Sequence, residues 1–324
     1  MILVDADVLG RNRTGEETYV LNLLRELPRV APDLQVAAVT RHPELVPDGV
    51  EALTLATPSQ ELRMAWTLPR LLRRMQPQLL HTQHALPLGW SGKSVVTLHD
   101  LHFEHDPEVM GLLDRLTFKA VVPRAARRAD HVIAVSERTK RDAVELYGIA
   151  PEKFTVTPHG VDPAFTPGGE PQGYALFVGA IQARKDPLAA LAQARAAGLP
   201  LVVAGPEKEP ALAQQLRDGG ADVRGWVEKP ELAELYRGAS VLLLPSLFEG
   251  FGVPVLEAMA SGTPVVVSAD PALREVAGDA AAPSIEAALA DRELYRQRGL
   301  ERAKLFTWQE SARRTADVYR QVLA

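Results

Sequence analysis

The second half of the chain alternates short apolar runs with amphipathic stretches at a regular spacing. The apolar runs are rich in Val and Leu and are continuous rather than alternating with polar residues. Strands of this kind are typical of parallel sheets that helices cover on both faces. We predict strands over 175–178, 201–204, 222–224, 241–244 and 264–268, and helices over 187–197, 209–219, 229–238 and 254–261. Two terminal helices follow, over 285–304, either continuous or broken, and over 308–323. The pattern predicts an α/β fold with a doubly wound parallel sheet.

The first half shows a weaker form of the same pattern. We predict strands over 2–8, 34–40, 52–55, 79–81, 95–98, 131–135 and 153–157, and helices over 17–27, 61–75 and 112–128. Residues 158–173 hold four prolines and four glycines, which indicates a linker. We therefore expect a first domain over 1–162, a second over 163–306, and a C-terminal helix over 307–324 that packs back on the first domain.

Composition excludes several classes of protein. The 324 residues, at roughly 150 per domain, suit two domains. A hydrophobic share of 46% and a charged share of 24% exclude disordered, collagen-like and coiled-coil chains. Cysteine is absent, which excludes a disulfide framework, a thiolate metal site and a Cys nucleophile. We expect a cytoplasmic protein, because Asp5 and Asp7 interrupt the apolar start and no stretch approaches the ~18 apolar residues of a membrane span.

Charge argues against nucleic acid as a partner. There are 19 basic and 21 acidic residues up to Asp162, and 17 and 20 after it, so the two halves carry −2 and −3. One predicted helix, 61–75, is locally basic. Its arginines are Arg63, Arg70, Arg73 and Arg74, and its apolar residues include Trp66, Leu71 and Leu72. A solvated helix with an apolar core face explains this pattern, and a peripheral contact with anionic lipid is the alternative.

The loop after the predicted strand 241–244 is the most informative in the chain. Gly252 precedes Pro254, which is placed to begin a helix, so backbone N–H groups and the positive helix end form a candidate anion site. Glu249 lies in this turn and Glu257 about one helical turn further on. Two carboxylates beside an anion site favour a ligand with hydroxyl groups, meaning a sugar.

A second loop, after the predicted strand 175–178, brings cations to the same region. Asp186 is placed to cap a helix that begins at Pro187. Arg184 and Lys185 stand just before that helix start, where they would neutralise a diphosphate and stabilise a leaving group. The alternative is an ordinary Arg-Lys pair in water.

Together these motifs resemble the retaining nucleotide-sugar glycosyltransferases of family 4 (group 1). Glu249 and Glu257, with seven residues between them, lie within the run Glu-Gly-Phe-Gly-Val-Pro-Val-Leu-Glu-Ala-Met-Ala-Ser-Gly-Thr-Pro-Val-Val. The supporting motifs are Phe177-Val-Gly, Arg184-Lys-Asp, Gly205, Leu235-Tyr-Arg-Gly-Ala, Arg274-Glu-Val-Ala-Gly-Asp, Val96-Thr-Leu-His-Asp-Leu and Val135-Ser. The likeness covers nearly the whole chain, with its motifs in the family's order.

The resemblance implies a GT-B fold, in which two Rossmann-like domains face each other across a cleft. The second domain would bind the nucleotide sugar and the first the acceptor. By the same resemblance, Glu257 would hold the ribose, Glu249 the donor sugar, and Arg184 and Lys185 the diphosphate. The resemblance also implies contacts to the donor from the backbone at Phe251, Gly252 and Val253 and from Gly179. The segment with Gly225 and Val227 would face the base. His99 would contact the donor sugar, and Gly15 would let the first loop approach the ligand.

The first loop departs from the family pattern. Members often carry two glycines and a basic residue there, whereas this chain has Gly15 followed by Glu16 and Glu17. This departure bears on the contacts with the acceptor. The usual Asn-Gly-Val-Asp also appears here as His159-Gly-Val-Asp.

The implied activity needs no metal or cofactor beyond the nucleoside diphosphate sugar. His99, His102 and His105 have a spacing that a helix could use to bind a metal, but Asp100 and Pro107 favour a strand end and a loop. The expected reaction moves mannose or glucose to a hydroxyl of a sugar or of a lipid-linked acceptor. The alternatives are a sugar phosphorylase on the same fold and a non-catalytic nucleotide-sugar-binding protein.

Overall fold

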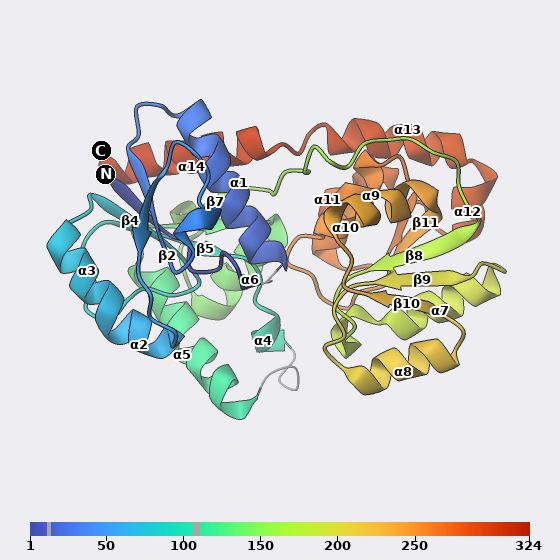
Figure 1. The fold of residues 1–324 in the computed structure, drawn as a ribbon, viewed down its shortest axis with the longest axis horizontal. Coiled ribbons are helices and arrows are strands. Elements are labelled where there is room, and N and C mark those ends of the chain that lie inside the picture. Colours follow the sequence, from blue (N-terminus) through green and yellow to red (C-terminus); the bar gives the residue numbers. More distant parts are fainter. Residues whose placement is uncertain (12–13, 106–110) are drawn as a thin grey trace. The chain divides into compact units, whose positions relative to one another are not determined.

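A computed structural model describes residues 1–11, 14–105 and 111–324 (Figure 1). The chain divides into two compact units. Unit 1 holds Met1–Gly160 together with Trp308–Ala324, and unit 2 holds Val161–Thr307. The last helix of the chain thus groups with the first unit.

Unit 1 is built on a seven-stranded sheet in the order β3-β2-β1-β4-β5-β6-β7. All its neighbouring strands pair in parallel. Leu3 on the central strand lies opposite Ala37 on one side and Leu80 on the other. The strands are β1 (Ile2–Asp5), β2 (Val36–Thr40), β3 (Glu51–Thr54), β4 (Leu79–Gln83), β5 (Ser94–Leu98), β6 (His131–Ala134) and β7 (Phe154–Val156).

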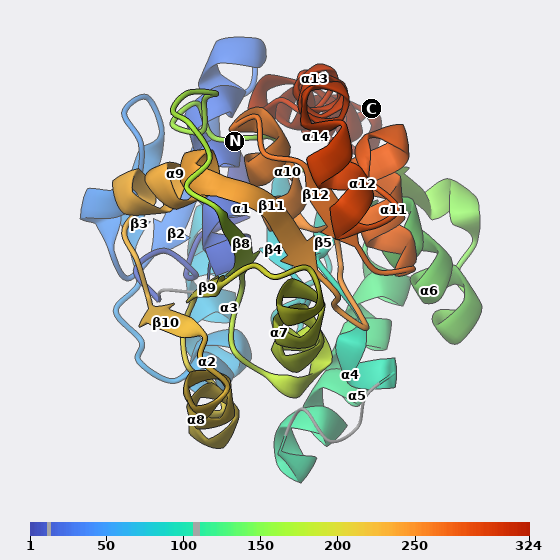
Figure 2. The same cartoon turned by 90° about the vertical axis from the view of Figure 1, so that its right-hand side faces the viewer.

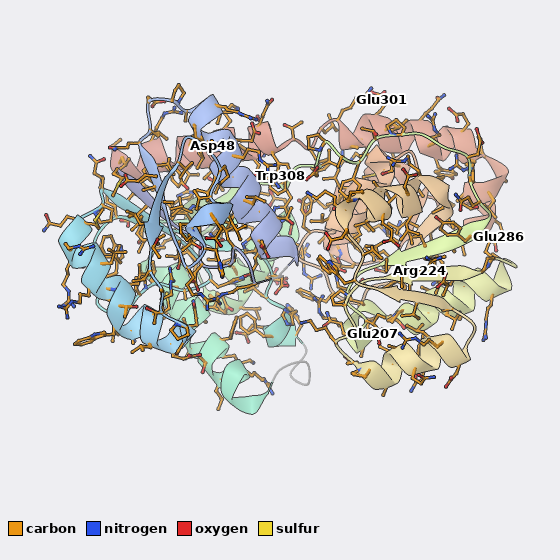
Figure 3. All side chains as sticks on the ribbon, viewed as in Figure 1. Asp48, Glu207, Arg224, Glu286, Glu301 and Trp308 are labelled. Atoms are coloured by element: carbon orange, nitrogen blue, oxygen red, sulfur yellow. The ribbon has the colours of Figure 1, made fainter. Side chains whose placement is uncertain are left out.

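Helices bury both faces of this sheet, because successive strand residues point to opposite sides. Val4 packs in the core under α1 (Thr14–Val30) and α14 (Trp308–Leu323), whereas Leu3 packs against α3 (Leu68–Met75). Figure 1 shows α1 and α14 side by side, and Figure 3 labels Trp308 at the start of α14. The remaining helical segments are η1 (Pro43–Leu45), α2 (Gln60–Leu62), the π-helical turn η2 (Arg63–Thr67), α4 (His102–His105), α5 (Leu112–Arg128), α6 (Glu137–Tyr147) and η3 (Pro151–Lys153).

Unit 2 holds a five-stranded parallel sheet in the order β10-β9-β8-β11-β12 (Figure 2). Its strands are β8 (Tyr174–Val178), β9 (Leu201–Ala204), β10 (Asp222–Gly225), β11 (Ala239–Leu244) and β12 (Val265–Val267). Its helical segments are η4 (Ala183–Lys185), α7 (Pro187–Ala196), α8 (Pro210–Asp218), α9 (Lys229–Gly238), α10 (Val253–Ala260), α11 (Pro271–Ala277), η5 (Gly278–Ala280), α12 (Ile285–Ala290) and α13 (Arg292–Ala303). The doubly wound parallel architecture predicted from the sequence is confirmed.

In both sheets, the strand order changes direction beside the strand that comes first in the sequence. In unit 1 the reversal falls between β1 and β4, and in unit 2 between β8 and β11. In open parallel sheets, ligands bind outside the carboxyl ends of the strands at this point, because the flanking loops leave in opposite directions. The loops after these four strands therefore border the expected ligand-binding sites.

Four local predictions are wrong. The helices α6 and α11 were not predicted, although Ser136 and Asp270 cap them with their side chains. Residues His102–His105 form the short helix α4 instead of a loop, while Pro107 lies outside the described residues. Helix α1 begins at Thr14, so Gly15 lies in its first turn rather than in the preceding loop.

Arg63 is the fourth exception, because it does not belong to the basic surface of its helix. It is fully buried and forms a two-point ion pair with Asp5, Nη1 to Oδ2 at 2.8 Å and Nη2 to Oδ1 at 2.7 Å. Its Nε lies 3.5 Å from Oδ1 of Asp7, which also contacts Arg41 and Arg11. This cluster joins η2 to the carboxyl end of β1.

Replacing Arg63 with Met should destabilise the protein by about 3–5 kcal/mol, because it leaves the buried Asp5 without its ion-pair partner. Urea unfolding followed by circular dichroism measures the loss. Arg70→Met is the matched control, since Arg70 is exposed on the adjoining helix, and it should change stability by less than about 0.5 kcal/mol. Equal losses in the two variants would contradict the assignment.

Candidate functional site

Three glycines shape the carboxyl edge of the sheet in unit 2. Gly179 follows β8, Gly205 follows β9, and Gly225 ends β10. The backbone N–H of Gly205 donates to the carbonyl of Gly225 at 2.7 Å, and a Cβ at Gly205 would collide with the carbonyl of Gly179. The edge is therefore lined by backbone, which lets a flat or charged ligand group approach closely.

Arg184 ties the loop after β8 to the loop after β11. Its Nη1 donates to the carbonyl of Phe248 at 2.9 Å, and its own carbonyl accepts from the N–H of Leu247 at 2.8 Å. These two loops flank the strand reversal of unit 2. The Arg184 side chain is consequently fixed beside the reversal rather than free in water.

Lys185 and Glu249 form a buried ion pair at the same place. Lys185 Nζ donates to Glu249 Oε1, and the two side chains are only 11% and 8% exposed. Arg184 Nη1 lies 3.9 Å from the second carboxylate oxygen of Glu249. Burying charges is unfavourable unless they are paired, so each of these side chains holds the others in place.

The side chain of Asp270 holds the backbone of Glu249 in place. Its N–H donates to Oδ2 of Asp270 at 3.3 Å, while Oδ1 of Asp270 caps α11 through the N–H of Ala272 at 2.9 Å. One carboxylate thus serves both a helix start and the site loop. Asp270 was not predicted as a site-supporting residue, although its Asp-Pro sequence matches the cap Asp186-Pro187.

Gly252 makes the turn that opens helix α10. Its φ of 106° lies in the region that favours glycine, and a Cβ there would stand 2.6 Å from Cδ2 of Leu273. The N–H of Val253 has no partner within the helix and lies at the positive end of its dipole, whereas Pro254 has no N–H and the N–H of Val255 donates to the Gly252 carbonyl at 3.0 Å. The Phe251 ring is buried against Phe306, 5.9 Å between centroids, so Phe251 offers the site its backbone.

Glu257 lies one turn further along α10, where its carboxylate accepts a 2.8 Å hydrogen bond from the Tyr236 hydroxyl. Burial raises the pKa of Glu257 to about 7; the Tyr236 hydrogen bond and Lys229 oppose this, whereas Asp162 adds to it. Lys229 Nζ is 2.5 Å from Oδ2 of Asp162. Tyr236 lies within a motif that the sequence singled out, but its hydrogen bond to Glu257 was not foreseen.

The segment after β10 is shaped by a turn at Gly225, whose φ is 67°. Val227 is half-buried, and the exposed Trp226 indole donates to Glu228 at 3.3 Å. Two charged side chains nearby, labelled in Figure 3, are already paired: Glu207 with Arg217 and Arg224 with Asp222. The backbone is accordingly the main polar surface of this segment.

Two of the twelve predicted residues lie in unit 1. His99 follows β5, and its Nε2 is 2.9 Å from Oε1 of Gln83. Burial lowers the pKa of His99 to about 4, opposed mainly by Glu16. The neutral ring stands edge-on to Tyr19 at 4.9 Å. Gly15 is exposed, and no atom lies within 4 Å of a Cβ placed there, so the protein itself does not require glycine at this position.

The ten other predicted residues all lie in unit 2, around the carboxyl ends of its strands. They are Gly179, Arg184, Lys185, Gly225, Val227, Glu249, Phe251, Gly252, Val253 and Glu257. In residues 1–11, 14–105 and 111–324, no three His, Cys, Asp or Glu side chains form a group that could hold a metal ion. Over the same described ranges, no helix is both long and apolar enough to cross a membrane.

Replacing Glu257 with Gln should stabilise the unliganded protein at pH 8 but not at pH 5. The pKa of Glu257 is about 7 when folded, against an ordinary value of 4.5. Between these values the unfolded chain binds fewer protons, so stability falls as the pH rises through this window. Gln removes the penalty, which amounts to at most about 3 kcal/mol.

Denaturant unfolding at both pH values measures this difference. The matched control is Glu301→Gln, an exposed carboxyl labelled in Figure 3, for which we expect no pH-dependent change. A Glu257→Gln variant that is no more stable at pH 8 than the wild type would show that burial does not destabilise the ionised form of Glu257.

Comparisons with known proteins agree with this geometry. Residues 13–165 match the model described as Glycosyltransferase Family 4, and residues 172–294 match the one described as Glycosyl transferases group 1. The chain is 28% identical to O-antigen chain mannosyltransferase B of Escherichia coli, over 88% of this chain and 82% of that one. It is 31% identical to D-inositol 3-phosphate glycosyltransferase 2 of Catenulispora acidiphila, over 74% and 64%.

Solved structures share the fold. Sucrose-phosphate synthase from Thermosynechococcus elongatus superposes with a TM-score of 0.74 at 20% identity, over 99% of this chain and 98% of that one. The catalytic domain of starch synthase IV from Arabidopsis thaliana, bound to ADP and acarbose, gives 0.71 at 13% identity, over 99% of both. The chain belongs to the family 4 (group 1) glycosyltransferases and has the GT-B fold, with two Rossmann-like domains.

Proposed function

We propose that this glycosyltransferase moves a hexosyl group from a nucleoside diphosphate sugar to an acceptor hydroxyl and retains the anomeric configuration. The observation that carries the proposal is the set of cations, helix-start amides and carboxylates at the β8/β11 reversal. Guanosine diphosphate mannose is the first donor to test, since two relatives are named O-antigen chain mannosyltransferases. Uridine diphosphate glucose is the second.

The diphosphate would lie between Arg184, Lys185 and the N–H of Val253 at the start of α10. A dianion there would meet two fixed cations and a helix dipole, beside a sheet edge that is lined by backbone. Glu257, one turn along the same helix, would accept hydrogen bonds from the ribose hydroxyls. Glu249 would accept from the donor sugar while still paired with Lys185, so the pair positions the sugar and the phosphate together.

The bond from the anomeric carbon to the diphosphate oxygen breaks, and the acceptor oxygen bonds to the same face of that carbon. The acceptor proton passes to the departing phosphate oxygen, so no separate base is needed. Arg184 and Lys185 stabilise the charge that builds on the diphosphate. His99, whose pKa of about 4 keeps it neutral at pH 7, serves as a hydrogen-bond partner for the donor sugar rather than as an acid.

Lys185→Ala should lower kcat by about 100-fold while changing donor affinity by less than about 5-fold, because the leaving-group charge is largest in the transition state. Donor affinity is read from thermal shifts over a panel of nucleotide diphosphates and their sugars. Turnover is read as nucleoside diphosphate released in the presence of acceptor, and the product anomer by NMR. The panel needs no metal ion.

Lys208→Ala is the matched control, because Lys208 is an exposed lysine of the same unit. An unaltered kcat in Lys185→Ala would remove Lys185 from the mechanism. An inverted product, or turnover that needs inorganic phosphate and no nucleotide sugar, would contradict the proposed reaction itself.

We also infer a peripheral membrane contact at the cytoplasmic face, which suits a lipid-linked acceptor. Leu62 and Trp66 are 51% and 58% exposed on the α2–η2 segment. Three exposed arginines continue the same segment into α3: Arg70, Arg73 and Arg74. Apolar side chains beside cations suit the surface of an anionic bilayer, at about 1 kcal/mol per Arg.

Vesicles of phosphatidylglycerol and phosphatidylcholine should sediment the wild-type protein, and Trp66→Ser should weaken that binding. Trp226→Ser is the control, since Trp226 is 51% exposed but lies in unit 2. Vesicles of phosphatidylcholine alone should bind weakly because they lack the negative charge. Equal effects of the two Trp variants would rule out the proposed surface.

A further inference from the structure

Helix α9 carries a tyrosine whose hydroxyl is used inside the protein. Tyr236 is fully buried, with an exposed fraction of 0%. Its hydroxyl donates to Oε2 of Glu257 on α10 at 2.8 Å. Glu257 itself is only half-buried. A ligand can therefore reach the side chain of Glu257, whereas it cannot reach that of Tyr236.

The two oxygens of the Glu257 carboxylate have different surroundings. Oε2 accepts the hydrogen bond from Tyr236, and burial together with the Glu257 charge raises the pKa of the Tyr236 hydroxyl well above its usual value, so that the hydroxyl keeps its proton. Oε1 has no hydrogen-bond partner within residues 1–11, 14–105 and 111–324. The carboxylate is thus fixed through one oxygen and open to hydroxyl donors at the other.

Tyr236 is itself held in place by two contacts. Its ring stands edge-on to Phe165, with 5.6 Å between the ring centroids and 85° between the planes. Its carbonyl accepts a 2.5 Å hydrogen bond from the hydroxyl of Thr263. The N–H of Thr263 in turn donates to the carbonyl of Ala258 on α10 at 2.9 Å. Helices α9 and α10 lie side by side (Figure 1) and are thus joined both through Thr263 and through the hydrogen bond to Glu257.

This arrangement suits a ligand with two neighbouring hydroxyl groups. The 2′ and 3′ hydroxyls of a ribose are such a pair, and a carboxylate of fixed orientation can accept from them. A nucleotide without these hydroxyls would leave a half-buried charge short of donors, and sites built to bind a hydroxyl reject such analogues for this reason. Without the Tyr236 hydroxyl, the carboxylate could adopt several orientations, and binding would have to order it.

We propose that Tyr236 is a positioning residue that orients the Glu257 carboxylate, and that the pair selects nucleotides with both ribose hydroxyls against those without them. This inference rests on the proposed function, in which Glu257 accepts hydrogen bonds from the ribose. It adds the residue that fixes the carboxylate and the class of nucleotide that the site rejects. Tyr236 acts only through Glu257, because its hydroxyl is buried.

The test compares guanosine diphosphate with its 2′,3′-dideoxy analogue, and uridine diphosphate with its own, by isothermal titration calorimetry on the full chain. Wild type should bind the ribonucleotide of at least one pair about 30-fold more tightly than the dideoxy form. Tyr236→Phe should weaken binding of that ribonucleotide by about 10-fold and of the dideoxy form by less than about 2-fold, since only the ribose depends on an oriented carboxylate. A role in folding alone would weaken both equally.

Tyr174→Phe is the matched control. Tyr174 is a tyrosine of the same unit that is 9% exposed, and its hydroxyl donates at 2.8 Å to the carbonyl of Leu235, the residue before Tyr236 on α9. The variant removes a hydrogen bond to the same helix that does not involve Glu257, so both affinities should change by less than about 2-fold. Melting temperatures are recorded for every variant.

Tyr236→Met also lacks the hydroxyl, fills the space with a flexible side chain, and should lower the preference likewise if Tyr236→Phe does not fold. Equal binding of both nucleotides of a pair by the wild type would overturn this inference alone. An unchanged preference in the Tyr236 variants, or an equal loss of preference in Tyr174→Phe, would do the same. If none of the four nucleotides binds, the donor proposal itself fails, and this inference fails with it.

Discussion

The ion pair between Lys185 and Glu249 is the contact on which the proposed donor site depends. It joins residues 64 positions apart and links the loops after β8 and β11, the two strands that flank the reversal. Neither charge could remain buried without the other. The cap at Asp270 and the turn at Gly252 then fix the backbone around the pair, so that a helix start faces the same place.

Buried ionisable groups recur in this protein where a ligand would supply the missing partners. Burial raises the pKa of Glu257, and the hydrogen bond from the Tyr236 hydroxyl offsets this only in part. In unit 1, His99 has a lowered pKa for the same physical reason. Each group is less stable unliganded than it would be in water, and hydroxyl groups are the partners that satisfy both a carboxylate and a neutral imidazole.

The two sheets carry different charged side chains at their strand reversals. Unit 2 places cations beside a carboxylate at its reversal, which suits a ligand that is anionic at one end and rich in hydroxyls at the other. Unit 1 places the Glu16 carboxylate beside the His84 imidazole at its own reversal. The shared strand order explains why these side chains lie at corresponding positions, and the loop sequences explain why their charges differ.

The sequence by itself determined the α/β architecture and which residues gather at the carboxyl edge of the sheet in unit 2, because both depend on local signals: continuous apolar strands, Pro at helix starts, and motifs that directly follow strands. It missed α6 and α11, whose caps at Ser136 and Asp270 are short signals next to stronger neighbours. Only the tertiary structure decided that Arg63 is buried on Asp5, that Glu257 accepts a hydrogen bond from Tyr236, and that Glu16 contacts His84. Burial and pairing of a charge depend on residues tens of positions away, which spacing along the chain does not encode.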